Sequence, residues 1–444
     1  MPKVTVIMPS LNVAKYIKPC MESVLAQTFK DIEILAIDAG SDDGTLEILQ
    51  KYALLDKRVK LIHSNKKSYG YQLNLGISLA QGEYIGVVET DDIIVADMFE
   101  TLYHQAIQTG VDYVKGTAQT FLKSASGIEV TNRILCVSNG EDMGKIICPK
   151  ENPELFVTDR FLWLGIYKSS FLRSVKLNET KGAAFQDIGF AFQVIEKADK
   201  AVYLNKDVYY YRQDNVNASS HDAKSFQYLV AEYTYIMQFL KGKSDRWYQA
   251  YYHKMWNQCL GRFLKMAALG RFWEEAYPEI SQLQSWIKEA VQKELLTEHM
   301  VGVANWKKVQ LFLIDLQGIY EECRMYYQQK KKELQDILQV IEKQKAIIFG
   351  VGRYGKFTHA LLESRLPGRV VAFCDNNISL RNQEVQGIPV LLPEDAVGSH
   401  MDAVYIVTNR RYEDEIRQQL KTLGVPEESV YRYEAGADLQ LFQL

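Results

Sequence analysis

Short apolar runs alternate with helical stripes over residues 4–92, and this alternation limits the folds that the chain can adopt. The apolar runs are rich in β-branched residues and too short for helices, so we expect strands at 4–10, 32–38, 59–63 and 86–92. Helices are expected at 14–27, where Ile17, Met21, Val24 and Leu25 share one stripe, and at 45–52. Strands separated by helices predict a parallel sheet with helices on its faces, the α/β class.

Two of the expected strands end in carboxylates. Asp38 ends the second strand, and the last strand ends in Glu89-Thr90-Asp91-Asp92. Carboxyl ends of parallel strands meet at one sheet edge, where open α/β folds bind ligands. Strand alternation places Glu89 and Asp91 on one side, where they could share a hard divalent cation with a phosphate-bearing ligand. The alternative is an acidic turn that caps the next helix.

Further short motifs follow in a fixed order. They are Pro9-Ser10-Leu11-Asn12, residues 23–28, Asp38-Ala39-Gly40-Ser41, residues 74–85, Glu89-Thr90-Asp91-Asp92, Trp163-Leu164-Gly165, Phe185-Gln186-Asp187 and Tyr210-Tyr211-Arg212. Together they resemble the GT-A glycosyltransferases of family 2, and residues 69–74 are similar to bacterial surface-polysaccharide members. The resemblance spans roughly the first half of the chain. It implies an inverting, metal-dependent transfer of sugar from a nucleotide-sugar, with UDP as the default nucleotide, to a glycan or lipid-linked acceptor.

The resemblance also implies a donor site at the ends of the first strands. Asp38 would accept a hydrogen bond from the base, although the family's acid lies one place later, where this chain has Ala39. A strand-end turn is the alternative role for Asp38. Arg212 could clamp a phosphate through its fork geometry. The expected donor-binding residues are Pro9, Asp38, Asn74, Glu89, Thr90, Asp91 and Arg212.

A metal ion, Mn²⁺ or Mg²⁺, is implied because Glu89-Thr90-Asp91 takes the place of the family's Asp-x-Asp motif. Asp91 is the expected direct ligand at the donor diphosphate. Glu89 is expected at the same ion, by direct coordination or through water and ribose. His221 is a further candidate ligand because imidazole suits Mn²⁺, with a solvated loop histidine as the alternative.

The catalytic step needs a base for the acceptor hydroxyl. Asp187 stands at the family's general-base position, after Gln186, and its structural alternative is an N-cap of the next helix. Trp163 is expected on the acceptor side, because an indole ring can stack on the apolar face of a sugar. A buried core tryptophan is the alternative for Trp163.

The remainder of the chain predicts two further domains, giving boundaries of 1–225, 226–344 and 345–444. Residues 226–344 carry aromatics at helical spacing and are expected to form a helical bundle. Its last helix carries an apolar stripe that suits packing on the next domain or a helix–helix dimer contact. From residue 346, a strand, a glycine turn, a helix and an acid-terminated strand match the dinucleotide-binding fingerprint of a small Rossmann-like fold. The candidate nucleotide-binding residues there are Gly350, Gly352, Gly355 and Asp375, with a packing or oligomerisation role as the alternative.

The composition of the chain limits the kinds of partner and the compartment that we expect. The net charge of -3 and the lack of Lys/Arg blocks beyond residues 330–332 argue against nucleic-acid binding. The six cysteines are scattered, a pattern typical of proteins with reduced thiols. The first residues leave no room for a signal peptide, and no apolar run is long enough for a membrane span. We therefore expect a cytoplasmic protein that meets a lipid-linked acceptor at the inner face of the membrane. Alternative functions are a non-catalytic nucleotide-binding scaffold and an NAD-linked oxidoreductase using the C-terminal domain.

Overall fold

The computed structural model describes residues 2–124, 127–137, 142–159, 161–182, 184–213, 215, 224–270 and 273–435. Its contacts divide the chain into two compact units, which we describe separately. The first unit comprises residues 1–119, 133–263 and 271–319, and the second comprises 120–132, 264–270 and 320–444. The helical region 226–319 thus belongs largely to the same unit as the N-terminal sheet, and the division into three domains is kept as a proposal.

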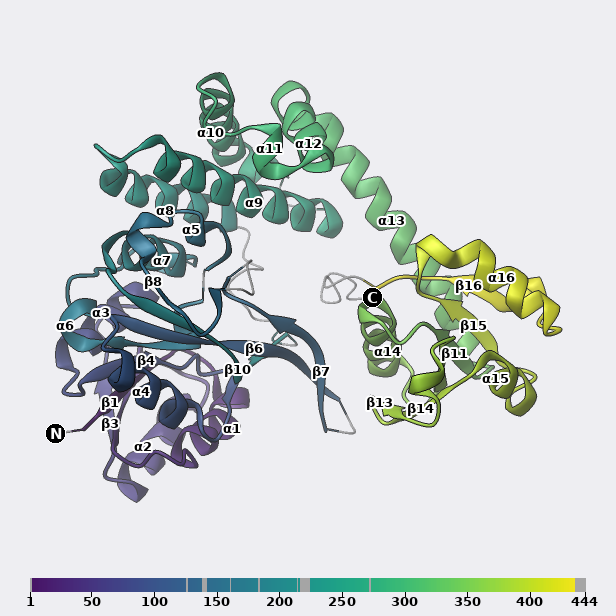
Figure 1. The fold of residues 1–444 in the computed structure, drawn as a ribbon, viewed down its shortest axis with the longest axis horizontal. Coiled ribbons are helices and arrows are strands. Elements are labelled where there is room, and N and C mark those ends of the chain that lie inside the picture. Colours follow the sequence, from purple (N-terminus) through teal and green to yellow (C-terminus); the bar gives the residue numbers. More distant parts are fainter. Residues whose placement is uncertain are drawn as a thin grey trace. The chain divides into compact units, whose positions relative to one another are not determined.

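The N-terminal half begins with four parallel strands joined by helices (Figure 1). The strands lie in the order β3-β2-β1-β4, and Ser10 of β1 pairs with Asp38 of β2. Helix α3 packs on β1 and β2, and α2 packs on β3. The elements are β1 (Val4–Ser10), α1 (Ala14–Leu25), β2 (Ile32–Asp38), α2 (Thr45–Leu55), β3 (Val59–His63), α3 (Tyr69–Leu79) and β4 (Tyr84–Val87).

One predicted strand is shorter than expected. Strand β4 ends at Val87, and the backbone amide of Asp92 donates to the carbonyl of Glu89 at 3.1 Å. Residues 89–92 therefore form a turn beyond the strand. The burial still alternates as predicted, because Thr90 and Asp92 are buried while Glu89 and Asp91 are partly exposed.

The same sheet continues beyond β4 with antiparallel pairing. Strand β9 (Gly165–Lys168) pairs with both β4 and β6, and the full order is β3-β2-β1-β4-β9-β6-β10-β5. The further strands are β5 (Ile93–Ile94), β6 (Tyr113–Ser124), β7 (Gly127–Ile134), β8 (Ile146–Ile147) and β10 (Ala201–Arg212). The helices of this part are α4 (Met98–Thr109), α5 (Leu155–Thr158), α6 (Ser169–Leu172) and α7 (Gln186–Lys197).

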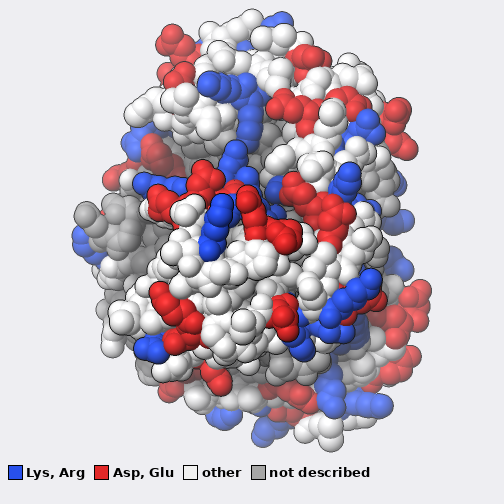
Figure 2. All heavy atoms as spheres, turned by 90° about the vertical axis from the view of Figure 1, so that its right-hand side faces the viewer, with Lys and Arg blue, Asp and Glu red and all other residues white. Residues whose placement is uncertain are grey.

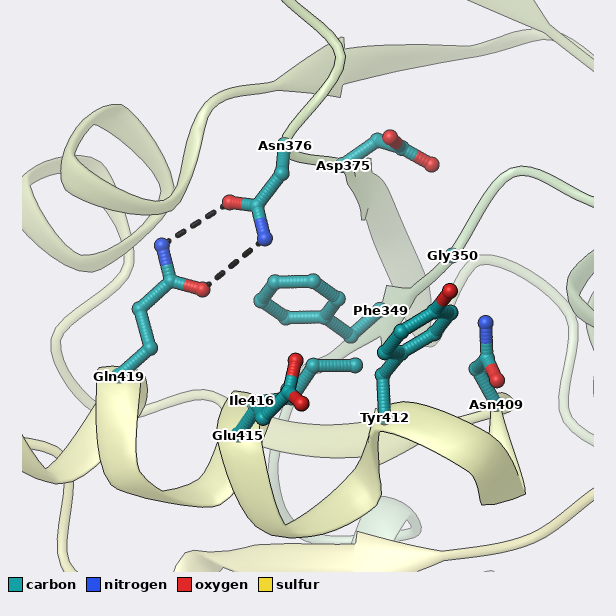
Figure 3. Close-up of a pocket in the computed structure, with 9 residues that line it drawn as sticks. All are labelled: Phe349, Gly350, Asp375, Asn376, Asn409, Tyr412, Glu415, Ile416 and Gln419. Carbon is teal, nitrogen blue, oxygen red and sulfur yellow. Dashed lines mark hydrogen bonds between the residues drawn. The ribbon is translucent and has the colours of Figure 1, made fainter.

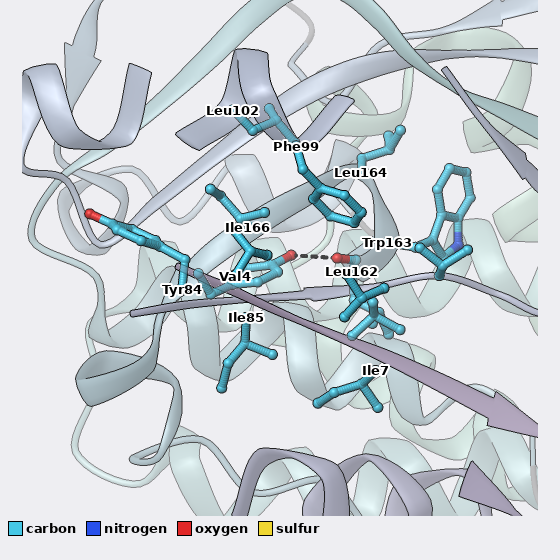
Figure 4. Close-up of a cluster of buried hydrophobic side chains, with 14 of the residues drawn as sticks. Val4, Ile7, Tyr84, Ile85, Phe99, Leu102, Leu162, Trp163, Leu164 and Ile166 are labelled. Carbon is cyan, nitrogen blue, oxygen red and sulfur yellow. Dashed lines mark hydrogen bonds between the residues drawn. The ribbon is translucent and has the colours of Figure 1, made fainter. Parts of the chain in front are cut away.

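The core of this unit lies between the sheet and its helices. Figure 4 shows part of it, with Phe99 and Leu102 of α4 near Leu164 and Ile166. Strands β1, β2 and β4 are buried along their whole length, which explains their continuous apolar sequence.

A buried ion pair crosses this core. Lys115 Nζ lies 2.6 Å from Asp159 Oδ1, and the two side chains are 1% and 0% exposed. The hydroxyl of Tyr203 donates to the other oxygen of Asp159 at 2.7 Å. Because the pair is closed to water, the removal of one partner leaves an uncompensated buried charge.

We therefore expect Lys115→Met to destabilise the first unit by about 3 to 5 kcal/mol. The double variant Lys115→Met/Asp159→Leu should recover a large part of that loss, because it removes both charges. Thermal unfolding midpoints of the two variants and the wild type measure this difference. A single variant as stable as the wild type would contradict it.

The helical region contains α8 (Ser225–Leu240), α9 (Asp245–Leu269), α10 (Trp273–Gln292), α11 (Glu298–Val301), α12 (Val303–Ile314) and α13 (Leu316–Ile341). Helix α8 packs on α7 and α10, and α10 packs on α12. Tyr233, Tyr251 and Trp256 are fully buried, so these aromatics serve the core. Within the described part of the chain, none of the helices combines the length and hydrophobicity required to cross a bilayer.

The second unit contains a smaller sheet in the order β13-β14-β12-β11-β15-β16. Strand β13 is antiparallel to β14 and the other pairs are parallel. Leu334, Ile337 and Ile341 of α13 belong to the core of this sheet, so the apolar stripe of that helix packs within its own chain. The elements are β11 (Ala346–Phe349), α14 (Arg353–Arg365), β12 (Val370–Cys374), β13 (Glu384–Val385), β14 (Ile388–Leu391), α15 (Pro393–Ser399), β15 (Val404–Val407), α16 (Glu413–Thr422) and β16 (Val430–Arg432).

Candidate active site

Carboxylates gather at the edge of the large sheet where β1, β2 and β4 end. The hydroxyl of Thr90 donates to the carbonyl of Pro9 at 2.8 Å, which joins the turn after β4 to the end of β1. The backbone amide of Glu89 donates to the hydroxyl of Tyr209 on β10 at 3.0 Å. These contacts fix the turn that carries Glu89 and Asp91 against strands β1 and β10.

Asp38 is fully buried at this edge and holds its own turn. One carboxylate oxygen accepts the amides of Gly40 and Ser41 at 2.8 and 3.0 Å. The other accepts the hydroxyl of Ser41 at 2.5 Å. Gly40 has a φ of 82°, a conformation that favours glycine. The geometry matches a turn role, and contact with a nucleotide base stays a prediction.

Glu89 lies among other acids. Burial raises the pKa of Glu89 to about 8; a hydrogen bond from Tyr69 opposes that rise, and the charges of Asp91 and Asp187 add to it. Asp187, at the first turn of α7, is therefore close enough to interact with the turn after β4. The fold thus brings together three acids that lie far apart in sequence.

Asp91 is contacted by the last residue of β10 and by a residue just beyond it. Asn215 Nδ2 donates to a carboxylate oxygen of Asp91 at 2.7 Å, and Arg212 Nε donates to the carbonyl of Asp91 at 2.6 Å. The Arg212 guanidinium lies 5.0 Å from the centre of the Tyr16 ring. Arg212 is 6% exposed, so its position is fixed by packing.

Asp92 points into the protein, as the alternation predicted. One of its oxygens accepts the backbone amide of Arg212 at 2.7 Å. Burial, with the nearby charge of Asp91, raises the pKa of Asp92 well above its usual range. Asp92 therefore joins β10 to the turn after β4 and carries a proton more readily than an ordinary carboxyl group.

Glu89 and Asp91 offer two carboxylate groups in the turn that follows β4. Carboxylates are the ligands that Mn²⁺ and Mg²⁺ prefer. The mutual repulsion that contributes to the raised pKa of Glu89 would be relieved by a cation beside Asp91. Among the residues that the structure describes, no group of three or more His, Cys, Asp or Glu side chains is arranged to hold a metal ion. His221 lies outside the described residues.

Two other candidates lie in well-packed surroundings. Trp163 is 6% exposed. The centre of its ring lies 4.2 Å from the ring centre of Tyr209 and 5.0 Å from that of Tyr211. Little of the indole faces solvent, and a sugar contact stays a prediction.

The side-chain amide of Asn74 makes two hydrogen bonds to the backbone of Leu177. Its Nδ2 donates to the Leu177 carbonyl and its Oδ1 accepts the Leu177 amide, both at 3.0 Å. It therefore ties α3 to the segment before α7.

Sequence reasoning missed several residues that shape this site. The Tyr69 hydroxyl donates to Glu89, Tyr209 holds the Glu89 amide, and Glu232 of α8 contacts the first turn of α7. Each partner is at least 20 residues away in the chain, so no local pattern could reveal it.

The C-terminal candidate residues separate into two groups. A pocket of about 350 Å³ includes Gly350 and Asp375, with Phe349 and Ile416 at its floor (Figure 3). Gly355 lies outside the lining and has a packing role, because a Cβ there would lie 1.8 Å from the carbonyl oxygen of Gly350. Gly352 also lies outside the lining residues.

Asp375 in this pocket already bonds the glycine turn. Its carboxylate accepts the amides of Val351 and Asn377 at 3.0 and 2.9 Å. The Asn376 and Gln419 side chains bond each other at one end of the pocket (Figure 3). The nine lining residues include Asp375 and Glu415 but no Lys or Arg, so the pocket itself offers no cationic side chain to a phosphate.

Surface charge gives no sign of a nucleic-acid interface on the face drawn in Figure 2. Lys and Arg side chains alternate there with Asp and Glu, without an extended basic patch.

Comparison with known proteins finds matches in both parts of the chain. Residues 5–163 match the model of glycosyl transferase family 2, and residues 342–431 match that of the C2185-like N-terminal domain. Glycosyltransferase GlyG of Streptococcus pneumoniae is 32% identical over 217 residues, which cover 47% of this chain and 70% of GlyG. An uncharacterized glycosyltransferase of Bacillus subtilis, EpsJ, is 30% identical over 223 residues, covering 48% of this chain and 62% of EpsJ.

Among solved structures, TarS of S. aureus (residues 1–349) in complex with UDP-GlcNAc has a TM-score of 0.54 at 18% identity. The match covers 74% of this chain and 92% of the TarS chain. At this identity the likeness concerns the fold. It confirms the predicted class: an N-terminal GT-A sheet, followed by helices and a small C-terminal sheet domain.

Proposed function

Because this chain belongs to glycosyltransferase family 2, we propose that it moves a sugar from a UDP-sugar to a glycan or lipid-linked acceptor, with inversion at the anomeric carbon. The observation that carries the proposal is the acid cluster at the sheet edge, where Glu89 and Asp91 lie within electrostatic reach of Asp187. UDP is favoured because structural neighbours were solved with UDP and UDP-GlcNAc.

In this proposal each residue has a separate task. Asp187 accepts the proton of the acceptor hydroxyl while the oxygen of that hydroxyl forms a bond to the anomeric carbon of the donor sugar. The bond from that carbon to the diphosphate oxygen breaks, and the diphosphate leaves with the electron pair. Asp91 and Glu89 would hold Mn²⁺ or Mg²⁺, which when bound neutralises charge on the diphosphate. Arg212 and Asn215 hold Asp91 in place.

The donor site of the proposal also includes Pro9, Thr90 and Asp38 at the strand ends. A hydrogen bond joins the Thr90 hydroxyl to the Pro9 carbonyl, so the two residues set the distance between the end of β1 and the turn after β4. Asn74 fixes the segment that leads to Asp187. Their contribution to donor binding is thus largely one of shape.

We place the protein in the cytoplasm, where a lipid-linked acceptor would be met at the inner membrane face. All six cysteines lie in the described residues, and no two of them form a disulfide, as expected for a reducing compartment.

Two alternatives have less support. A non-catalytic scaffold does not account for the raised pKa of Glu89, which is typical of functional sites. An NAD-linked oxidoreductase would need the C-terminal pocket to hold a pyrophosphate. Its lining carries two carboxylates and no cation, and the Val351 amide is already bonded to Asp375.

Calorimetric titration with UDP tests the nucleotide class. We expect heat of binding in the presence of Mn²⁺ and at least tenfold weaker binding with EDTA, a loss of roughly 1.4 kcal/mol. Titrations with GDP, dTDP and CMP serve as matched controls. Equal binding with and without metal would contradict the metal role, and binding of GDP in place of UDP would change the donor.

A further inference from the structure

A buried carboxyl group on helix α8 contacts the helix that carries Asp187. Glu232 is 1% exposed. Its Oε1 accepts the backbone amide of Gly189 at 3.0 Å, and its Oε2 accepts the side-chain amide of Asn178 at 3.1 Å. Gly189 lies in the first turn of α7, two residues after Asp187. Glu232 therefore satisfies one of the amides that a helix start leaves without a partner in the helix.

This contact depends on the absence of a side chain at position 189. A Cβ there would lie 2.1 Å from Glu232 Oε1 and 3.4 Å from the Tyr235 ring. Glycine weakens a helix relative to alanine, so a helical glycine usually has a packing or functional reason. Here the reason is the close approach of the Glu232 carboxyl group.

Charge also couples the two residues. Burial raises the pKa of Glu232 to about 8; the hydrogen bond from Asn178 opposes that rise, and the charge of Asp187 adds to it. Among the described residues, Tyr233 and Tyr235 of the same helix also interact with the charge of Glu232, which raises the pKa of both hydroxyl groups, and the charge of Glu179 adds to the rise at Tyr235. Glu232 is thus mostly protonated at pH 7 and ionises as the pH passes about 8.

We propose that Glu232 is a positioning residue for Asp187. It holds the first turn of α7 so that Asp187 faces the acid turn after β4, and its charge sets the strength of Asp187 as a base. The inference rests on the proposed function, since it assigns Asp187 as the base. It also gives the helical region, beyond the family match at 5–163, a part in the reaction.

The sign of the pH effect follows from the charges. When Glu232 ionises, its negative charge stabilises the protonated Asp187 that forms as the acceptor loses its proton. The wild-type kcat should therefore rise as the pH passes about 8. Glu232→Gln keeps the shape of the neutral form and cannot ionise, so its kcat should rise less than that of the wild type over the same range, and the ionisation of Glu89 beside Asp187 accounts for the rise that remains.

The experiment compares steady-state UDP release by four test variants and one control variant of the full chain between pH 6 and pH 9. Glu232→Ala and Gly189→Ala should each lower kcat by about 10- to 100-fold with little change in donor KM, because Asp187 is displaced. The double variant should be no worse than either single one, since both remove the same contact. Glu232→Gln should restore kcat at pH 7, and the exposed Glu275→Gln on α10 is the control.

The outcomes separate this inference from the proposed function. An unchanged kcat in Glu232→Ala, with Asp187→Asn inactive, overturns the positioning role alone. A Glu232→Gln profile that rises with pH as the wild type does overturns the electrostatic part. Full activity in Asp187→Asn removes the base itself and this inference with it.

Discussion

Asp187→Asn is expected to lower the rate of sugar transfer by about 10²- to 10⁴-fold, the range that a general base contributes. Asparagine has nearly the same shape but cannot take the proton of the acceptor hydroxyl. Since Asp187 is placed on the acceptor side of the reaction, the affinity for UDP in Mn²⁺ should change by less than about threefold. UDP release and calorimetry on the same preparation measure the two quantities.

Asp199→Asn is the matched control for this variant. Asp199 lies just beyond the end of α7 and is 68% exposed in a surface ion pair with Lys150. The same chemical change there should leave turnover intact. If Asp187→Asn turned over as fast as the wild type, the base would have to be another group. A loss of UDP binding together with turnover would mean that Asp187 acts on the donor.

Asp91→Ala should remove the metal-dependent part of UDP binding, with a loss of about 100-fold or more in affinity. Outer residues that merely orient metal ligands cost about 10- to 100-fold, so a direct ligand should cost at least as much. The variant also releases the contacts from Asn215 to the Asp91 side chain. Titration of UDP in Mn²⁺ and in EDTA measures the effect, and the two curves should coincide for the variant.

The adjacent acid offers a sharp control. Asp92 has a pKa well above its usual range, because it is buried and near Asp91. Asn is a neutral isostere of a protonated carboxyl group and can still accept the Arg212 amide. Asp92→Asn should therefore keep metal-dependent binding. If Asp92→Asn lost metal dependence and Asp91→Ala kept it, the assignment of the two neighbouring acids would be reversed.

The parallel part of the fold could be predicted from sequence because its signals are local. Strands β1, β2 and β3 have the bounds expected from their apolar runs. A buried strand needs a continuous apolar run and leaves that pattern in the sequence. The alternating order of strands and helices then restricts the topology.

The antiparallel part of the sheet could not be predicted in this way. Strand β9 joins β4 to β6, although the sequence led us to expect no strand at residues 165–168. Its pairing depends on contacts between distant segments, such as Gly86 with Ile166. A Cβ on Gly165 would lie 2.3 Å from the carbonyl oxygen of Val114, so the close strand approach becomes visible only in the fold.

The site shows the same division. The strand-end acids Asp38 and Asp91 were found from sequence because each follows an apolar run. The roles of their neighbours could not be predicted from sequence. Tyr69, Tyr209 and Glu232 reach the acid turn or α7 from distant elements. Motif order predicts which acids form the site, whereas the charge coupling between them depends on tertiary structure.

The most direct test is the hydrolysis of UDP-GlcNAc, UDP-glucose and UDP-galactose in Mn²⁺, in which water takes the sugar and UDP is released, with wild type and Asp187→Asn side by side. We expect UDP release by the wild type from at least one donor, well above that of the variant, and its loss on addition of EDTA. Release that is equal in the two proteins for every donor, or absent from both, would contradict a UDP-sugar transferase that uses Asp187 as its base.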